Sequence, residues 1–198
     1  MNIKSVYFFF IFSIFIVGCE LFTTRTPEDP NTSSLNYPPA TSYEILLNNF
    51  SNSINELSSE NYYNCFLSDD EVESISYTFF PSPDAVARYG IVFENWTSFS
   101  EKNFLLGLKS KVESGIMPSF KWTSGNFEIM TLDSTVYVGQ YELSMNLQKE
   151  LETFSGISRM TFIHNSSGLW KIKTWQDFQL NSSDSAKTFS ILKGQIAN

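Results

Sequence analysis

The chain has 198 residues and a formal net charge of −8, with 13 Lys and Arg against 21 Asp and Glu. This length suits one domain, and a content of 42% apolar and 16% aromatic residues excludes disorder over most of the chain. The acidic balance argues against a nucleic-acid-binding protein, because few basic groups are present to neutralise phosphates.

Residues 1–18 have the pattern of a secretion signal. Lys4 precedes an apolar run over residues 6–17, which is too short to span a bilayer and matches the core of a signal peptide. The run ends in Ile16-Val17-Gly18-Cys19, which resembles the lipobox of bacterial lipoproteins. This resemblance implies cleavage before Cys19 and acylation of Cys19, so that acyl chains anchor the protein in a membrane. The expected location is the cell envelope, in the outer membrane if the host has two membranes.

The other cysteine, Cys65, lies among aromatic residues. If Cys19 carries lipid, Cys65 has no partner, and a buried thiol that acts as a small apolar group is the favoured interpretation. A nucleophilic cysteine would need a neighbouring base, and the chain has only one His. A Cys19–Cys65 disulfide is the alternative if Cys19 is not acylated.

Residues 19–40 are expected to form a tether that follows the anchor. Four of the seven prolines fall here, among Thr, Ser and Asn, and there is no apolar period. The sequence therefore predicts a signal peptide at residues 1–18, a lipidated cysteine with a proline-rich tether at 19–40, and one folded domain at 41–198.

Apolar residues then recur with helical spacing. Thr41 and Glu44 fit a capping box that opens a helix. Its apolar stripe consists of Tyr43, Leu46, Leu47, Phe50, Ile54 and Leu57. A shorter helical turn is predicted around Tyr62. The acidic run at residues 68–73 lacks the glycine and spacing of a calcium loop, which indicates a solvated turn.

Three short elements come next in the chain. Alternating apolar residues predict a half-buried strand over residues 75–79. A short helix is predicted over residues 83–89, ended by Gly90. A longer helix is predicted over residues 98–115, with Glu101 completing a second capping box.

From Ser119 onward the apolar period changes from 3.6 to 2, which predicts a meander of antiparallel strands. One long strand has an apolar face, formed by Tyr137, Tyr141, Leu143, Met145 and Leu147. Gly139 in this strand indicates a bulge or bend. Residues 165–168 form a hairpin loop, and the chain returns over residues 169–178. Helices followed by a meander predict an α+β domain, with the helices on one face of the sheet.

Two segments carry a resemblance to a known family. They are Gly168-Leu-Trp170-Lys-Ile172-Lys-Thr-Trp175-Gln-Asp177 and Phe189-Ser-Ile-Leu-Lys-Gly194. Together with the order of the elements, they are similar to lipid-anchored bacterial members of the nuclear transport factor two-like superfamily, over about residues 41–195. The resemblance implies a cone-like fold, in which N-terminal helices pack on a strongly curved antiparallel sheet around an apolar cavity open at one end. The family includes ketosteroid isomerases, dehydratases, polyketide cyclases and non-catalytic binding domains, so the fold does not give the function.

Enzymes of this fold carry an Asp base, an Asp–His pair or a Tyr–Asp pair in the cavity. The predicted inward faces of the strands hold no carboxylate, because Glu142 and Asp177 fall on the outward phase unless a bulge reverses one of them. His164, the only histidine, borders a hairpin, where an exposed or edge position is expected. The candidate pocket-lining residues are Trp96, Tyr137, Tyr141, Met160, His164 and Trp170.

No catalytic residue, metal site or cofactor is predicted. Nucleotide-binding, nucleophile-elbow and zinc-protease motifs are absent, and one His with one available thiol makes zinc improbable. Five N-x-S/T sequons, at Asn31, Asn49, Asn95, Asn165 and Asn181, leave a eukaryotic glycoprotein as an alternative, although Ser and Asn are abundant enough for chance to explain them.

Three functions remain open from the sequence. The first is an envelope lipoprotein with a non-catalytic domain that binds a small apolar ligand or a partner protein, with a homodimer allowed. The second is an enzyme of the isomerase, dehydratase or hydrolase type. The third is a structural subunit of an envelope assembly. The lack of a recognisable acid–base pair favours the first and the third.

Overall fold

The computed structural model describes residues 37–68, 75–180 and 187–198. The predicted signal peptide, Cys19, most of the tether and the acidic residues 69–73 lie outside this part of the chain. The described elements are α2 (Tyr43–Asn55), α3 (Ser59–Tyr63), β1 (Thr78–Phe80), α4 (Pro83–Phe93), α5 (Ser98–Lys111), β2 (Ser119–Met130), β3 (Ser134–Leu147), β4 (Glu150–His164), β5 (Trp170–Phe178) and α6 (Phe189–Ala197).

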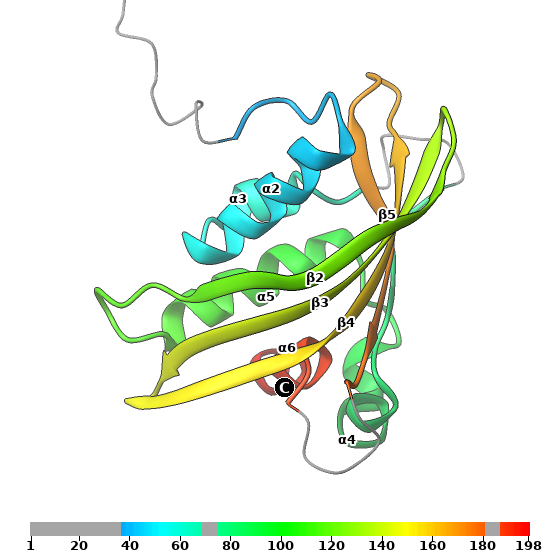
Figure 1. The fold of residues 1–198 in the computed structure, drawn as a ribbon. Coiled ribbons are helices and arrows are strands. Elements are labelled where there is room, and N and C mark those ends of the chain that lie inside the picture. The colour runs from blue at the N-terminus through cyan, green and yellow to red at the C-terminus, as the bar shows by residue number, and fades with distance from the viewer. Residues whose placement is uncertain (1–36, 69–74, 181–186) are drawn as a thin grey trace, which may run out of the picture. The chain divides into compact units, whose positions relative to one another are not determined.

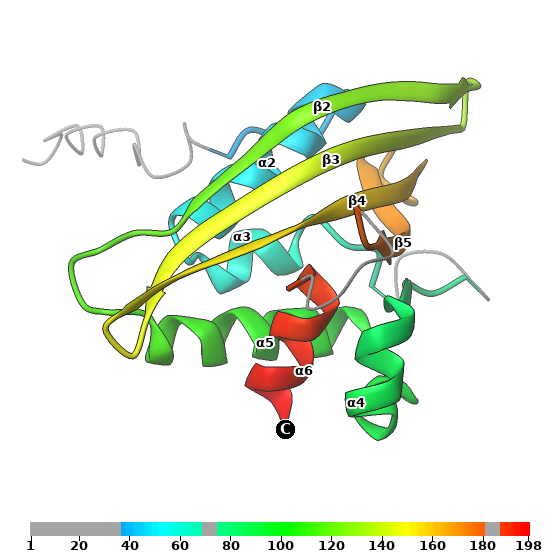
Figure 2. The ribbon, with the colours of Figure 1, turned by 60° about the horizontal axis from the view of Figure 1, so that its bottom comes forward.

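The strands form one sheet in the order β1-β5-β4-β3-β2. Strands β2 to β5 are an antiparallel meander, as predicted, whereas β1 pairs in parallel with β5. The long strands are strongly curved, and α5 and α6 lie beneath the sheet (Figures 1 and 2). The structure therefore confirms an α+β fold in which helices pack on a strongly curved sheet. Among the described residues, the departures from a purely antiparallel arrangement are β1 and an isolated parallel bridge between Phe66 and Ile172, both beside β5.

The inward face of β3 is the one that the sequence predicts. Its side chains Tyr137, Tyr141, Leu143, Met145 and Leu147 are all buried. Of the bulge or bend predicted at Gly139, the bulge is wrong, because β3 pairs with β4 without a register shift. The irregularities lie in the neighbouring β2, between Trp122 and Ser124 and between Phe127 and Ile129.

Gly139 has a packing role. A Cβ atom at this position would lie 2.7 Å from the Tyr137 ring and 2.8 Å from the Trp122 ring. These distances are too short for any side chain, so the glycine makes room for two aromatic rings on the inward face.

The N-terminus of α2 differs from the prediction by one residue. Ser42 is the N-cap, and its hydroxyl accepts a hydrogen bond from the backbone N–H of Ile45 at 3.4 Å. The predicted Thr41–Glu44 capping box is therefore wrong. Thr and Ser are both favoured at the N-cap, with Ser somewhat the better, and here the cap is the adjacent Ser42.

The N-terminus of α5 shows the same difference. Thr97 caps the helix and forms the reciprocal capping box with Ser100. The predicted box of Ser98 and Glu101 is wrong, and Glu101 is thereby available for another role. Helix α5 also ends at Lys111, before the predicted end at Gly115.

Two other elements differ in length from the prediction. Helix α4 continues past Gly90 to Phe93, with non-helical backbone angles at Tyr89 that mark a kink. The strand predicted over residues 75–79 is shorter and begins at Thr78. Helix α4 can continue through Gly90 because a glycine within a helix costs only about 1 kcal/mol, and the packing of α4 against α6 can outweigh this cost.

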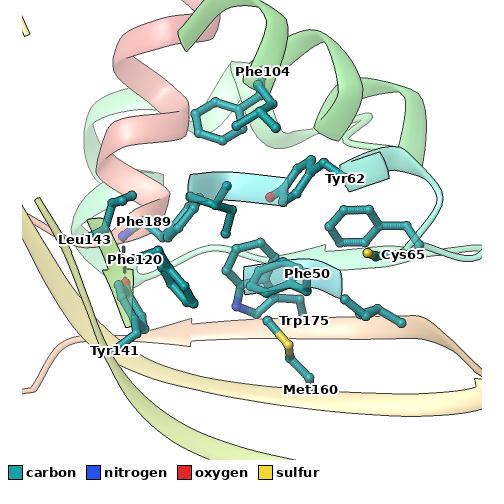
Figure 3. Close-up of a cluster of buried hydrophobic side chains, with 14 of the residues drawn as sticks. Phe50, Tyr62, Cys65, Phe104, Phe120, Tyr141, Leu143, Met160, Trp175 and Phe189 are labelled. Atoms are coloured by element: carbon teal, nitrogen blue, oxygen red, sulfur yellow. Dashed lines mark hydrogen bonds between the residues drawn. The ribbon is translucent and has the colours of Figure 1, made fainter. Parts of the chain in front are cut away.

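The core is built largely from aromatic rings. Phe50 on α2 and Trp175 on β5 lie at its centre, with ring centroids 5.4 Å apart in an edge-on arrangement (Figure 3). The rings of Phe66 and Phe120 also lie against Phe50. These contacts join α2 to β5 and to the edge strand β2.

Helix α6 was not predicted as a helix, and it fills the space beneath the sheet. Its residues from Phe189 to Gly194 are all buried, including Lys193. A helix that is buried on every side belongs to the interior of a domain. Figure 2 shows α6 beside α5 and α4, with which it makes direct contacts.

Candidate functional site

A carboxylate and an ammonium group meet inside the domain. Glu101, in the first turn of α5, and Lys193, on α6, are both fully buried, and Oε1 of Glu101 lies 2.6 Å from Nζ of Lys193. The same oxygen accepts hydrogen bonds from Tyr77 at 2.6 Å and from the indole N–H of Trp96 at 2.8 Å. Oε2 accepts one from Tyr62 at 3.0 Å. Four donors therefore hold the Glu101 carboxylate in place.

Aromatic rings surround the ammonium group of Lys193. Its Nζ lies 3.5 Å from the ring centroid of Phe79 and 3.7 Å from that of Trp175. The rings of Trp96, Phe104 and Phe189 stand farther away, at 5.5 to 5.9 Å. Burial lowers the pKa of Lys193 to about 8, against the opposing effect of Glu101.

A second buried carboxylate lies on β5. Oδ1 of Asp177 accepts a hydrogen bond from Tyr141 at 2.7 Å, and Oδ2 accepts from both the backbone N–H and the hydroxyl of Ser190. The Tyr141 oxygen in turn accepts from the backbone N–H of Phe189 at 2.7 Å (Figure 3). Burial raises the pKa of Asp177, although these hydrogen bonds and the charge of Lys193 oppose the shift.

A bulge in β5 brings Asp177 to the inward face. Thr174 pairs with Thr161, whereas Ile172 pairs with the next residue of β4, so that Lys173 is the extra residue. The bulge shifts the side-chain phase by one position. The expectation that the inward faces hold no carboxylate is therefore wrong, and the reversal that the sequence left open occurs at Asp177. Glu142 stays on the outward face, 2.7 Å from the ammonium group of Lys121.

The polar cluster is closed and internally satisfied. In the described part of the chain, every buried side-chain nitrogen and oxygen has a hydrogen-bond partner. Four surface pockets of about 220 to 360 Å³ are present among the described residues, and none is lined by Glu101, Asp177 or Lys193. In this arrangement both carboxylates bind groups of α6, and none of these four pockets is lined by either of them.

The candidate pocket-lining residues do not converge on one site. Trp96 lines a surface pocket of about 330 Å³ between α4, α5 and α6, and Trp170 lines another of about 260 Å³ beside α2 and α3. Tyr137, Tyr141 and Met160 are buried in the core. The remaining candidate, His164, is partly buried at the end of β4, with its ring 4.0 Å from that of Trp170.

Three charged residues of the cluster, Glu101, Asp177 and Lys193, were not predicted as site residues from the sequence, each for a different reason. Glu101 lies three residues after Ser98 and fits the pattern of a capping box, so nothing in the neighbouring sequence indicates that it is buried. Asp177 was considered, but its phase depends on a bulge. Lys193 gave the clearest signal, since it is the single charge within the otherwise uncharged run from Phe189 to Gly194.

Cys65 is a free thiol in the interior, as expected. Its sulfur donates to the backbone carbonyl of Asn61 at 3.3 Å. Burial raises the pKa of Cys65 to about 12, which disfavours the thiolate that a nucleophile requires.

The described residues contain no group of three or more side chains of the kind that hold a metal ion. Among the same residues, no helix combines the length and the apolar composition needed to cross a membrane.

No family model and no curated protein matches the sequence. Solved structures match the fold. A putative aromatic ring hydroxylase from Novosphingobium aromaticivorans is similar with a TM-score of 0.54 at 10% identity, over 78% of this chain and 93% of the other. A putative scytalone dehydratase from the same organism has a TM-score of 0.54 at 14% identity, over 74% and 89%.

A third similar structure is a putative calcium/calmodulin-dependent protein kinase II association domain from Xanthomonas campestris. Its TM-score is 0.52 at 10% identity, over 81% of this chain and 95% of the other. At these identities the likeness concerns the fold alone. Proteins described as enzymes and as an association domain share the fold, so it does not choose between catalysis and assembly.

Proposed function

We propose that this chain is a lipid-anchored cell-envelope protein whose cone domain performs no catalysis and acts by contacting a partner protein. The observation that carries the proposal is the filled interior. Helix α6 occupies the space beneath the sheet, and the buried acid and base groups are bound to one another. The envelope location and the anchor rest on the signal-like segment and Cys19.

The filled interior also weighs against a small apolar ligand inside the cone. A ligand pocket for a small molecule generally encloses about 300 Å³ or more and buries most of the ligand. Here the space inward of Tyr141 is taken by Phe189, whose ring centroid lies 5.8 Å from that of Tyr141. Of the two binding modes open from the sequence, contact with a partner protein is the better supported.

One observation favours an enzyme as the second candidate. Tyr141 and Asp177 form a buried hydrogen-bonded pair of 2.7 Å, a type of pair that the family resemblance associates with catalysis. Asp177 would serve as a base only if α6 moved away, because Ser190 and Tyr141 now take up its lone pairs. Catalysis by Asp177 would therefore require a form of the domain in which α6 has moved away from it.

Uptake of an apolar fluorescent probe separates these candidates. We expect no stoichiometric binding to the wild-type protein, whereas Phe189→Ala, which leaves a cavity beneath the sheet, binds the probe. Phe178→Ala is the matched control, since Phe178 is an exposed phenylalanine on the outer face of β5. Stoichiometric binding by the wild type, or a lipid that co-purifies with it, would support the ligand-binding or enzymatic alternative.

The anchor is tested on the native protein. Mass spectrometry is expected to find an N-terminal Cys19 that carries acyl chains, and Cys19→Ser is expected to leave the membrane fraction. An unmodified Cys19 in the wild type would remove this part of the proposal and leave the cone domain as described.

Contact with a partner is tested at an exposed apolar side chain. Ile91 on α4 is 85% exposed, and Val86 on the same helix is also exposed. A photo-crosslinking residue at Ile91 is expected to give one defined adduct in the envelope. The same residue at the exposed Lys149, in the β3–β4 turn, is the control, and adducts of equal pattern at both positions would count against a specific partner on α4.

A further inference from the structure

The side chain of Lys193 is held as a bound ligand would be held. Its ammonium group has one charged partner in contact, Glu101 at 2.6 Å, and two aromatic faces, Phe79 at 3.5 Å and Trp175 at 3.7 Å. None of these partners lies on α6. The closest partners therefore come from α5, β1 and β5, and α6 supplies the cation together with the more distant ring of Phe189.

The chemistry of this pocket suits a primary ammonium ion. Aromatic faces attract a cation, and the attraction grows when water is excluded. A carboxylate adds the directed hydrogen bond and the opposite charge. A neutral group of the same shape would leave Glu101 charged, buried and without its countercharge, which is strongly unfavourable.

The pocket is rigidly organised by groups other than Lys193. Glu101 is oriented by Tyr62, Tyr77 and Trp96, at 2.6 to 3.0 Å. Removal of the lysine side chain would leave these three donors in place. A preorganised site of this kind binds without a further ordering cost.

The Lys193 pocket shares two of its residues with a pocket at the surface. Trp96 and Phe104, which face the ammonium group, also line the surface pocket of about 330 Å³ between α4, α5 and α6. These two rings therefore belong both to the wall of the surface pocket and to the surroundings of Nζ of Lys193. Ring movements there would admit a small molecule.

We propose that the space filled by the Lys193 side chain is a primary-ammonium binding site, for which α6 is the built-in occupant. In the wild type the site is saturated by its own chain. When the lysine side chain is shortened, a small alkylammonium ion takes its place. This inference concerns the interior of the domain and does not depend on the anchor or on the partner.

The test uses the full chain with Lys193→Ala and the n-propylammonium ion, which matches the three carbons and the nitrogen that the substitution removes. Thermal unfolding is expected to shift upward with propylammonium in a saturable way. The dissociation constant is expected to be at least tenfold lower than that of 1-propanol, which has the same length but no charge. The wild type is expected to show no saturable shift with either compound.

Two further variants identify the site. Leu192→Ala opens a cavity one residue away on the same helix and is expected to show no preference for propylammonium over propanol. Lys193→Ala combined with Glu101→Gln is expected to lose the preference. If Lys193→Ala does not fold alone, the yield of folded protein after refolding in each compound is measured instead. Equal effects of propylammonium and propanol on Lys193→Ala, or the same preference in Leu192→Ala, would overturn the proposal.

Discussion

At the scale of single residues, the cost of burying charge decides how this domain responds to substitution. Glu101 and Lys193 are fully buried, and removal of one member of such a pair leaves the other without compensation. We expect Glu101→Gln to lower the free energy of unfolding by about 3–5 kcal/mol. Urea unfolding at pH 7 measures this change.

Glu142→Gln is the matched control for this prediction. It removes the same charge from the surface pair with Lys121, where both side chains are solvated. Exposed pairs contribute about 0–1 kcal/mol, so the control is expected to unfold almost as the wild type does. Equal losses in the two variants would show that the buried pair has no special importance.

The pH dependence of stability carries a second prediction. Burial lowers the pKa of Lys193 to about 8 from 10.5, so between these values the folded state binds fewer protons than the unfolded state. Stability therefore rises with pH in this window. We expect the wild type to gain stability relative to Lys193→Met between pH 8 and 10.5, as measured by urea unfolding at each pH.

Tyrosines act in the opposite direction at higher pH. Burial raises the pKa values of Tyr62, Tyr77 and Tyr141 well above 10, so above that pH the folded state keeps protons that the unfolded state loses. Their effect lowers stability as pH rises. It is common to the wild type and to Lys193→Met, so it cancels in the comparison. A flat difference between the two proteins would contradict the assignment to Lys193.

At the scale of elements, the close fit of α6 against α4 is the critical contact. A Cβ atom at Gly194 would lie 2.3 Å from the ring of Tyr89, within the kinked part of α4. We expect Gly194→Ala to destabilise the domain by about 1–3 kcal/mol, because the overpacking outweighs the better helix propensity of alanine. Thermal unfolding measures this effect.

Gly90→Ala on α4 provides the control. The nearest atom to a Cβ there is a methyl group of Val86 at 4.0 Å, which is ordinary contact. Alanine is the better helix former, so this variant is expected to be as stable as the wild type or up to about 1 kcal/mol more stable. A loss of stability at Gly90 equal to that at Gly194 would point to a backbone effect and not to the fit of α6.

The same scale shows what the sequence could predict. Alternation along β3 places Tyr137 and Tyr141 on the inward face, because a continuous register carries a simple period of two. In β5 the bulge at Lys173 breaks this period, and only the pairing with β4 reveals it. The inward position of Asp177 therefore could not be predicted from a sequence pattern that assumes regular strands.

The polar cluster was missed for a related reason. Local patterns describe how each residue fits its own element, whereas Glu101 and Lys193 owe their roles to a contact across 92 positions of the chain. Glu101 fits the pattern of a helix cap, and no helix was predicted around Lys193. The contact exists only after α6 has folded back beneath the sheet, which the meander of strands does not by itself indicate.

At the scale of the whole molecule, the described part of the chain begins with a short segment that is docked on the domain. This segment, Tyr37 to Ala40, lies along α2. Its contacts are Tyr37 to Glu56 at 2.7 Å, Asn49 to the carbonyl of Pro38 at 2.8 Å, and the backbone N–H of Trp170 to the carbonyl of Ala40 at 2.8 Å. The last contact ties the segment to the start of β5, so the segment contributes to the fold.

Two truncated chains test where the tether ends. We expect a chain that starts at Tyr37 to unfold at the same temperature as one that starts at Glu20, because the contacts of the docked segment are kept. A chain that starts at Thr41 loses all three contacts and is expected to be less stable by about 1–3 kcal/mol. Equal stability of the Tyr37 and Thr41 chains would show that the docked segment adds nothing, and a weaker Tyr37 chain would assign a structural role to residues 20–36. With the expected result, and under the proposed anchoring at Cys19, residues 20–36 would be the linker, with a full extension of about 60 Å.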